Sequence, residues 1–218
     1  MENFSLDVFN TPSPLANPSA LYGIGYGLYI VTTRENGKDS GLVVNTVSQV
    51  GSHPDLIAVS VNNANHSCGV IARTGKLNVN ILTEQAPFSL FQNFGFQSGK
   101  TADKMKGLLY GRSENNLPVL REFTNAYLSL EVVSTLTLPS HTLFFCTVGE
   151  SATLSKEPTM SYAYYHANTK PKKPAPKEGE KKTGWVCKIC GYIHEEETLP
   201  ADFICPICKH PASDFEKL

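Results

Sequence analysis

Four cysteines near the C-terminal end of the chain form two close pairs, Cys187-x-x-Cys190 and Cys205-Pro-x-Cys208. Two such pairs can supply all four thiolate ligands of one tetrahedral metal site. Thiolate sulfur selects zinc or iron, and the two metals predict different functions. Zinc has no redox chemistry and would make this segment a structural ribbon, whereas iron would make it an electron carrier. The cysteines alone leave both possibilities open.

The chain has 218 residues, of which 41% are hydrophobic, so it can form one sizeable core and a small appendage. Residues 1–169 carry 10 basic and 12 acidic side chains, which excludes a strongly basic nucleic-acid surface. We find no signal peptide and no apolar run of about 18 residues, and therefore expect no membrane span and a cytoplasmic location. In a reducing compartment the paired cysteines favour metal over disulfides, and Cys68 and Cys146 are interpreted as ordinary thiols.

Residues 170–182 contain three prolines, six lysines and no large apolar side chain. Such a segment cannot bury itself in a core, and it predicts a flexible linker. The linker, residues 169–183, would span about 50 Å at full extension. We therefore expect a main domain at residues 1–168, with an N-terminal extension at 1–18, and a metal module at residues 184–218. Because the module is so short, metal should be required for its stability.

Upstream of the linker the pattern predicts mainly strands. Residues 26–33 and 40–50 are β-rich runs on either side of Asn36-Gly37, which is a strong hairpin signal because both turn positions tolerate positive φ. Further β-rich runs cover residues 56–61, 77–83, 126–136 and 142–153. Short helices are expected around residues 67–73, ended by Gly75, and around residues 87–94, with Pro87 in the first turn. The predicted fold class is mainly β, an antiparallel barrel with short helices and a small C-terminal metal domain.

The C-terminal module resembles rubredoxin, the small one-iron electron carrier. The resemblance lies in Cys-x-x-Cys-Gly-Tyr, in Cys-Pro-x-Cys, and in the aromatic residues Trp185, Phe203 and Phe215. It implies iron at Cys187, Cys190, Cys205 and Cys208, enclosed by an aromatic core. Lys209 departs from the pattern, because rubredoxins usually have glycine there, and a side chain in left-handed backbone costs on the order of 1 kcal/mol. A zinc ribbon remains the alternative.

The main domain resembles the flavin reductase-like FMN-binding split barrel. The matching stretches are residues 26–33, 45–49, 57–63 with 66–67, 95–96 with 98–100 and 103–104, and 141–145. The resemblance implies bound FMN, NADH or NADPH as a transient hydride donor, and a homodimer. Gly23-x-Gly25-x-Gly27 lacks the dinucleotide-binding spacing and precedes a strand, so the nicotinamide is expected in the open flavin cleft.

The resemblance also implies the residues of the flavin pocket. Those expected along the flavin ring are Asn45, Thr46, Val47, Ser48 and Gln49, and those expected at the phosphate are Asn62, Asn63, His66 and Ser67. The phosphate group lies where a strand gives way to a helix N-terminus, a natural anion site. His141 is expected on the nicotinamide side of the pocket. Plainer interpretations remain open: Asn62 and Asn63 as a turn, Thr46 and Ser48 as edge-strand residues, and His141 as a structural histidine.

Together the two modules predict a conversion from two-electron to one-electron transfer. NAD(P)H delivers two electrons as hydride, a one-iron site carries one electron at a time, and FMN connects the two. This order of modules resembles the fused flavoprotein–rubredoxin electron donors of anaerobes, and it implies an acceptor redox protein, a flavodiiron protein that reduces nitric oxide or oxygen. Two alternatives are a flavin or ferric reductase with a regulatory tail, and an FMN-binding sensor with a structural zinc ribbon.

Overall fold

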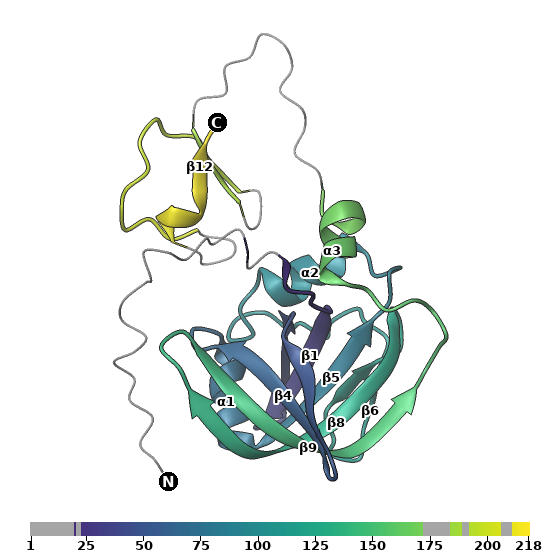
Figure 1. The fold of residues 1–218 in the computed structure, drawn as a ribbon. Coiled ribbons are helices and arrows are strands. Elements are labelled where there is room, and N and C mark those ends of the chain that lie inside the picture. Colours follow the sequence, from purple (N-terminus) through teal and green to yellow (C-terminus); the bar gives the residue numbers. More distant parts are fainter. Residues whose placement is uncertain (1–19, 21–22, 172–183, 189–191, 206–210) are drawn as a thin grey trace.

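The computed structural model describes residue 20 and residues 23–171, 184–188, 192–205 and 211–218. Antiparallel strands dominate the described part of residues 23–171, and the sheet curves into a barrel (Figure 1). The elements are β1 (Tyr29–Glu35), β2 (Lys38–Val44), β3 (Val47–Ser52), β4 (Asp55–Asn62), α1 (His66–Thr74), β5 (Lys76–Leu82), α2 (Phe88–Gly95), β6 (Tyr110–Arg112), β7 (Pro118–Leu120), β8 (Thr124–Thr137), β9 (His141–Thr153), α3 (Tyr162–Tyr164) and a π-helix (Tyr165–Thr169). The predicted mainly β fold class is confirmed.

The first hairpin forms where the sequence predicts it. Asn36 and Gly37 have φ of 50° and 79°, as a two-residue turn with two positive-φ positions requires. The expected single strand over residues 40–50 is wrong, because β2 ends at Val44 and β3 begins at Val47. The sheet order is β2-β1-β5-β8-β9-β4-β3, so these two strands lie at opposite ends of the sheet. The Thr46 carbonyl already accepts from Ser60 N of β4 at 3.1 Å, which draws the chain away from β1.

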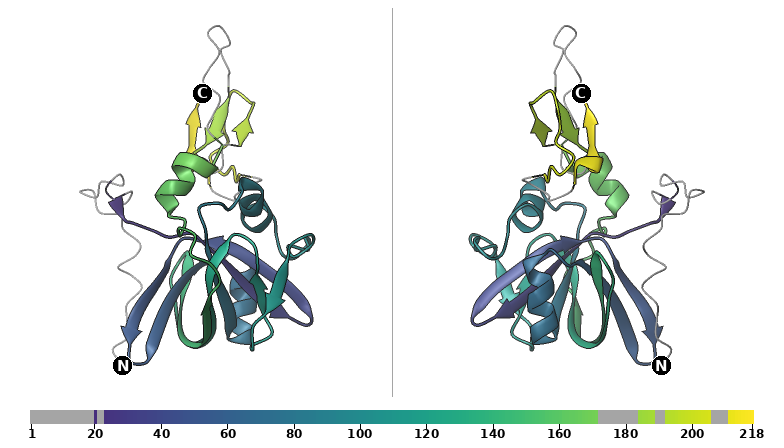
Figure 2. Two further views of the ribbon diagram at one scale, coloured as in Figure 1. Left: turned by 90° about the vertical axis from the view of Figure 1, so that its right-hand side faces the viewer. Right: turned by 90° about the vertical axis from the view of Figure 1, so that its left-hand side faces the viewer.

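Two hydrophobic cores flank the sheet, because successive side chains of a strand point to opposite faces. In β1, Val31 belongs to the core that α1 joins through Ile71. Its neighbour Ile30 belongs to the other core, which contains Phe94 of α2 and Tyr165. All of these side chains except Tyr165 are at most 1% exposed. The second core therefore fixes α2 and the segment 162–169 at the same end of the barrel (Figure 2).

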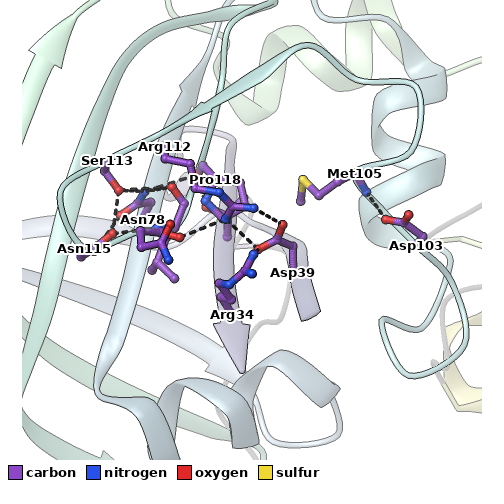
Figure 3. A network of polar contacts seen from close by, with 12 residues as sticks. Arg34, Asp39, Asn78, Asp103, Met105, Arg112, Ser113, Asn115 and Pro118 are labelled. Carbon is purple, nitrogen blue, oxygen red and sulfur yellow. Dashed lines mark hydrogen bonds and ion pairs between the residues drawn. The ribbon is translucent and has the colours of Figure 1, made fainter. Parts of the chain in front are cut away.

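Polar contacts, from exposed to buried, hold the β6–β7 hairpin on the sheet (Figure 3). The Asp39 carboxylate accepts from Arg34 at 2.8 Å and from Arg112 at 2.7 Å. Burial opposes the charged form of Asp39, but the two arginine hydrogen bonds outweigh it, and the pKa of Asp39 is lowered. Asn78, fully buried in β5, donates to Ser113 Oγ at 2.7 Å. These contacts connect β1, β2, β5 and β6.

The two predicted helices are present with small shifts in their bounds. Gly75 ends α1 in left-handed backbone, with its N–H donating to Ile71 O, as expected. Pro87 is the N-cap of α2 and not its first helical residue. Within the described residues, no helix is long and apolar enough to cross a membrane.

The described part of the metal module contains a three-stranded sheet in the order β11-β10-β12. Its small core includes the aromatic side chains of Trp185, Tyr192, Phe203 and Phe215. Its elements are β10 (Trp185–Cys187), β11 (Ile193–His194), a 3-10 turn (Ala212–Asp214) and β12 (Phe215–Lys217).

Candidate functional site

A cavity of about 620 Å³ opens at the end of the barrel that carries α2 and the segment 162–169. Its lining includes the end of β2 with the two residues that follow, the end of β4, the start of α1, the loop after α2, the start of β9 and residues of the segment 162–166. Six of the ten residues predicted for the flavin pocket line this cavity. They are Asn45, Thr46, Asn62, His66, Ser67 and His141. Because they come from three separate stretches of sequence, their meeting is a property of the fold.

The start of α1 offers hydrogen-bond donors to an anion. Its N-cap residue Asn65 makes no side-chain cap, and no acidic residue lies in the first turn. The amides of a helix's first turn lack partners within the helix and attract negative charge. Ser67 Oγ lies 3.2 Å from Ser40 Oγ, beside Gly99, where an added Cβ would overlap the Ser40 hydroxyl. Gly99 therefore lets the loop after α2 pack directly against the Ser40 side chain beside this helix end.

The charges around His66 favour an anionic ligand. Burial lowers the pKa of His66, and the nearby cations Lys100, Arg73 and Lys38 lower it further. Lys38 Nζ also donates to the Lys100 carbonyl at 2.9 Å, which holds the two lysine segments together. A phosphate placed beside the start of α1 would meet this positive potential.

Asn63 does not line the cavity. Its side chain donates to Leu138 O at 2.9 Å and accepts from Thr142 Oγ1 at 2.8 Å, and so it fastens the end of β4 to β9. Asn62 also makes a local turn contact, since its Oδ1 accepts from Ala64 N at 2.9 Å. Asn63 thus has a structural contact with the start of β9, and its predicted contact with phosphate stays a prediction.

Of the residues expected along the flavin ring, only Asn45 and Thr46 line the cavity. Val47, Ser48 and Gln49 lie on β3, where Ser48 and Gln49 are exposed. Gln49 Nε2 donates to Asp55 at 2.9 Å, across the β3–β4 pair. The contact of these three residues with flavin stays a prediction.

His141 lies opposite Asn62 in the β4–β9 pairing and faces the same cavity. Its Nδ1 is 2.9 Å from Ser140 Oγ, which orients the imidazole ring. This position is compatible with the predicted role beside the nicotinamide, and that role remains a prediction.

The loop after α2 supplies cavity residues to which the sequence analysis gave no role. They are Phe96, Gln97, Ser98 and Gly99, together with Lys104 beyond the loop. The signal was available, because residues 95–96, 98–100 and 103–104 are among the stretches that resemble flavin-binding barrels. Sequence spacing gave no indication that this loop folds back over β2.

Lys104 joins two walls of the cavity. Its Nζ donates to Gly41 O of β2 and to Phe94 O of α2, each at 2.8 Å. Burial lowers the pKa of Lys104 to about 8. Among the described residues no carboxylate forms an ion pair with this ammonium group. In the described part of the chain, the carbonyl dipoles of Gly41 and Phe94 are therefore the groups that stabilise this ammonium in the cavity wall.

An aromatic wall, defined as Tyr162, Tyr165 and His166, closes another side of the cavity. The ring centroids of Tyr162 and His166 are 4.5 Å apart, and Tyr165 stands 4.6 Å from Phe91 of α2. Sequence reasoning missed this wall, since His166 had no partner pattern and the two tyrosines gave no site signal.

In the metal module, Cys187 and Cys205 are both fully buried within one aromatic cluster. Phe203 and Phe215 pack edge to face within it, with centroids 5.4 Å apart. Cys190 and Cys208 lie outside the described residues. For this reason no group of three possible metal ligands occurs among the described residues.

Residues 21–172 match the family described as flavin reductase like domain. The chain belongs to this family. Its C-terminal residues 185–216 match a second family, described as rubrerythrin, rubredoxin-like domain. The presence of both domains in one chain identifies a flavin-dependent electron-transfer protein of the oxidoreductase class.

Known relatives of this flavin reductase-like chain share one or both domains. A high molecular weight rubredoxin from Moorella thermoacetica is 34% identical, over 91% of this chain and 98% of its own length. A ferric-chelate reductase (NAD(P)H) from Archaeoglobus fulgidus is 32% identical, over 71% of this chain and 92% of its own. The solved FMN-binding protein from Thermus thermophilus has the same fold, with a TM-score of 0.58 and 16% identity, over 66% of this chain and 80% of that one. These comparisons confirm the expected flavin reductase–rubredoxin architecture.

Proposed function

We propose that this chain oxidises NADH or NADPH with FMN in the barrel cavity, and passes single electrons through an iron ion in the metal module to an acceptor redox protein. The observation that carries the proposal is the gathering of six predicted flavin-pocket residues around one cavity, in a chain that ends in a rubredoxin-like domain. When bound, FMN accepts hydride and releases single electrons, and a four-thiolate iron site exchanges one electron.

The cavity residues fit FMN. We assign the phosphate to the start of α1, where Ser67 and His66 lie beside uncapped amides and nearby lysines. Asn45 and Thr46 would contact the flavin ring, and His141 would face the nicotinamide. The close approach of Gly99 to the Ser40 hydroxyl brings the loop after α2 beside the position assigned to the phosphate.

The metal module fits iron through the chemistry of its donors. Cys187 and Cys205 are buried among Trp185, Phe203 and Phe215, in surroundings that exclude water from a thiolate site. With Cys190 and Cys208 the donor set would be four thiolates, which suits iron and also zinc. The kinship with a high molecular weight rubredoxin favours iron.

The proposed domain organisation and partners follow from the same resemblance. We assign residues 1–168 to the barrel, residues 169–183 to the linker and residues 184–218 to the iron module. A homodimer, a cytoplasmic location and a flavodiiron acceptor that reduces nitric oxide or oxygen complete the proposal, all from the resemblance between this chain and fused flavoprotein–rubredoxins.

Absorption spectra of the purified protein test the relay. We expect both flavin and ferric-thiolate bands, and we expect anaerobic NADH or NADPH to bleach both. If the iron band persists while flavin is reduced, the relay is wrong.

Cys208→Ala should retain flavin reduction by NADH and lose delivery to the acceptor, because the iron site would lack one of its four ligands. Unchanged delivery would contradict the iron step.

A second candidate function is a ferric or flavin reductase whose tail is regulatory. The 32% identity to a ferric-chelate reductase over most of the barrel favours it. If FMN stays bound throughout turnover, release of reduced flavin is excluded. If the parent protein and Cys208→Ala reduce ferric chelates at equal rates, the ferric reductase is supported. The sensor alternative requires zinc, so a ferric-thiolate band argues against it.

A further inference from the structure

The aromatic wall stands at the point where the barrel passes into the linker. Ser161 caps the short helix α3 by accepting from Tyr164 N at 3.0 Å, and Tyr162 N donates to Tyr26 O at 2.9 Å. The π-helix then carries the chain to Thr169, the first residue assigned to the linker. π-helical turns occur often at functional sites. The residues that line one side of the flavin cavity are thus also those that anchor the tether of the metal module.

One residue of the metal module contributes to the same cavity. Pro211 lines it together with Tyr162, Tyr165 and His166. Pro211 forms a bridge with Ile204, which is 52% exposed and directly precedes the buried Cys205. An apolar tip of two residues, Ile204 and Pro211, therefore lies beside a predicted metal ligand.

We propose that the metal module docks on the barrel through Ile204 and Pro211, against the aromatic wall of Tyr162, Tyr165 and His166. The inference deepens the proposed function and rests on it for its purpose, because docking here would bring the Cys205 side of the metal site to the mouth of the flavin cavity. The metal module of this same chain is what binds the aromatic wall. Pro211 of the module already lines the cavity beside the wall, and the linker to the module begins shortly after the wall ends.

The size of the contact suits a reversible complex. Two apolar side chains against three rings form a patch far below the area of roughly 1,200 Å² that stable interfaces bury, and electron-transfer encounters are characteristically small. Covalent attachment compensates for this weakness, because a short tether holds the module at an effective concentration on the order of millimolar. The module can then dock at the flavin cavity and leave for the acceptor.

Hydrogen–deuterium exchange on the full-length holoprotein tests the docking site directly. Ile204→Glu places a carboxylate against the rings, and Ile193→Glu is the matched control, since Ile193 is an exposed isoleucine of the same module (38%) on β11. We expect amides of residues 161–170 to exchange roughly tenfold faster in the Ile204 variant, because a carboxylate resists desolvation. The control should match the parent protein. Equal exchange in all three proteins would overturn the proposal.

A second readout separates docking from the relay itself. After reduction by NADH, electron transfer from flavin to iron within the chain should slow about tenfold in Ile204→Glu and remain unchanged in Ile193→Glu. If the parent protein shows no such transfer, the proposed function fails, and the exchange data still decide the docking site. If the parent transfers electrons and both variants match it, the docking site is wrong and the function stands. Should Ile204→Glu lose its ferric-thiolate band, Pro211→Glu replaces it with the same two expectations.

Discussion

At the scale of single residues, Lys104 shows how a buried charge can organise a binding cavity. Its ammonium group bonds the carbonyls of Gly41 and Phe94, and burial lowers its pKa from 10.5 to about 8. The unfolded chain therefore holds more protons than the folded chain between these two values. Stability linked to this group must increase as pH rises through that window.

We predict that this pH dependence disappears in Lys104→Met. Between pH of about 8 and 10.5, the stability of the parent protein relative to the variant should rise by on the order of 2 kcal/mol. Urea unfolding at pH values across the window measures the difference. Lys106→Met is the control, and it should keep the slope of the parent protein. A parallel pH profile for Lys104→Met and the parent would contradict the buried-charge account.

At the scale of elements, Asp39 connects β2 to β1 and β6 through two arginines. Its side chain is 10% exposed, whereas the Lys76–Glu131 pair has both side chains about half exposed or more and a separation of 3.9 Å. Buried charged hydrogen bonds contribute more than exposed ion pairs, because removal of one partner leaves the other charge without compensation. The arginine contacts of Asp39 should therefore matter for the position of the β6–β7 hairpin.

We predict that Asp39→Asn lowers the free energy of unfolding by about 2 kcal/mol at neutral pH. The lowered pKa of Asp39 means that its contribution is present above the unfolded value of 3.8 and is lost as pH falls through the folded pKa. Urea unfolding measures both effects. Glu131→Gln should change stability by less than about 0.5 kcal/mol, and equal losses in the two variants would show that burial does not distinguish these pairs.

At the scale of the whole molecule, the two domains should differ in what stabilises them. The barrel has two hydrophobic cores of its own, whereas the described residues of the metal module form a small cluster around Cys187, Cys205 and Phe215. Small domains bury too little surface to fold on apolar contacts alone. Metal binding should supply the missing free energy in the module.

We predict that removal of the metal unfolds the module and leaves the barrel folded. Trp185 is the chain's one tryptophan and belongs to the module, so its fluorescence reports on that domain alone. Its emission should shift to longer wavelength when a chelator removes the metal, because the indole ring becomes exposed to water. Circular dichroism of the barrel strands and FMN affinity should not change. A matching loss of barrel structure would show that the domains fold as one unit.

Local features of the fold could be predicted because their causes are local. The Asn36-Gly37 turn and the Gly75 helix end each depend on backbone preferences within a few residues. The division of residues 40–50 between two edges of the sheet could not be predicted in this way. It depends on the pairing of Thr46 with Ser60 on β4, and the composition of a β-rich run does not indicate which strand it will pair with.

The sequence by itself determined the chemistry that this protein carries: two cysteine pairs for a metal, and polar stretches that resemble a flavin pocket. Tertiary structure decided which of those residues meet. It placed Asn45, His66 and His141 around one cavity and turned Asn63 toward β9. It also brought Lys104 and the aromatic wall to that cavity, although the sequence analysis gave neither of them a role. The physical reason is that residue type fixes what a side chain can bind, whereas strand pairing and core packing over long sequence separations fix its neighbours.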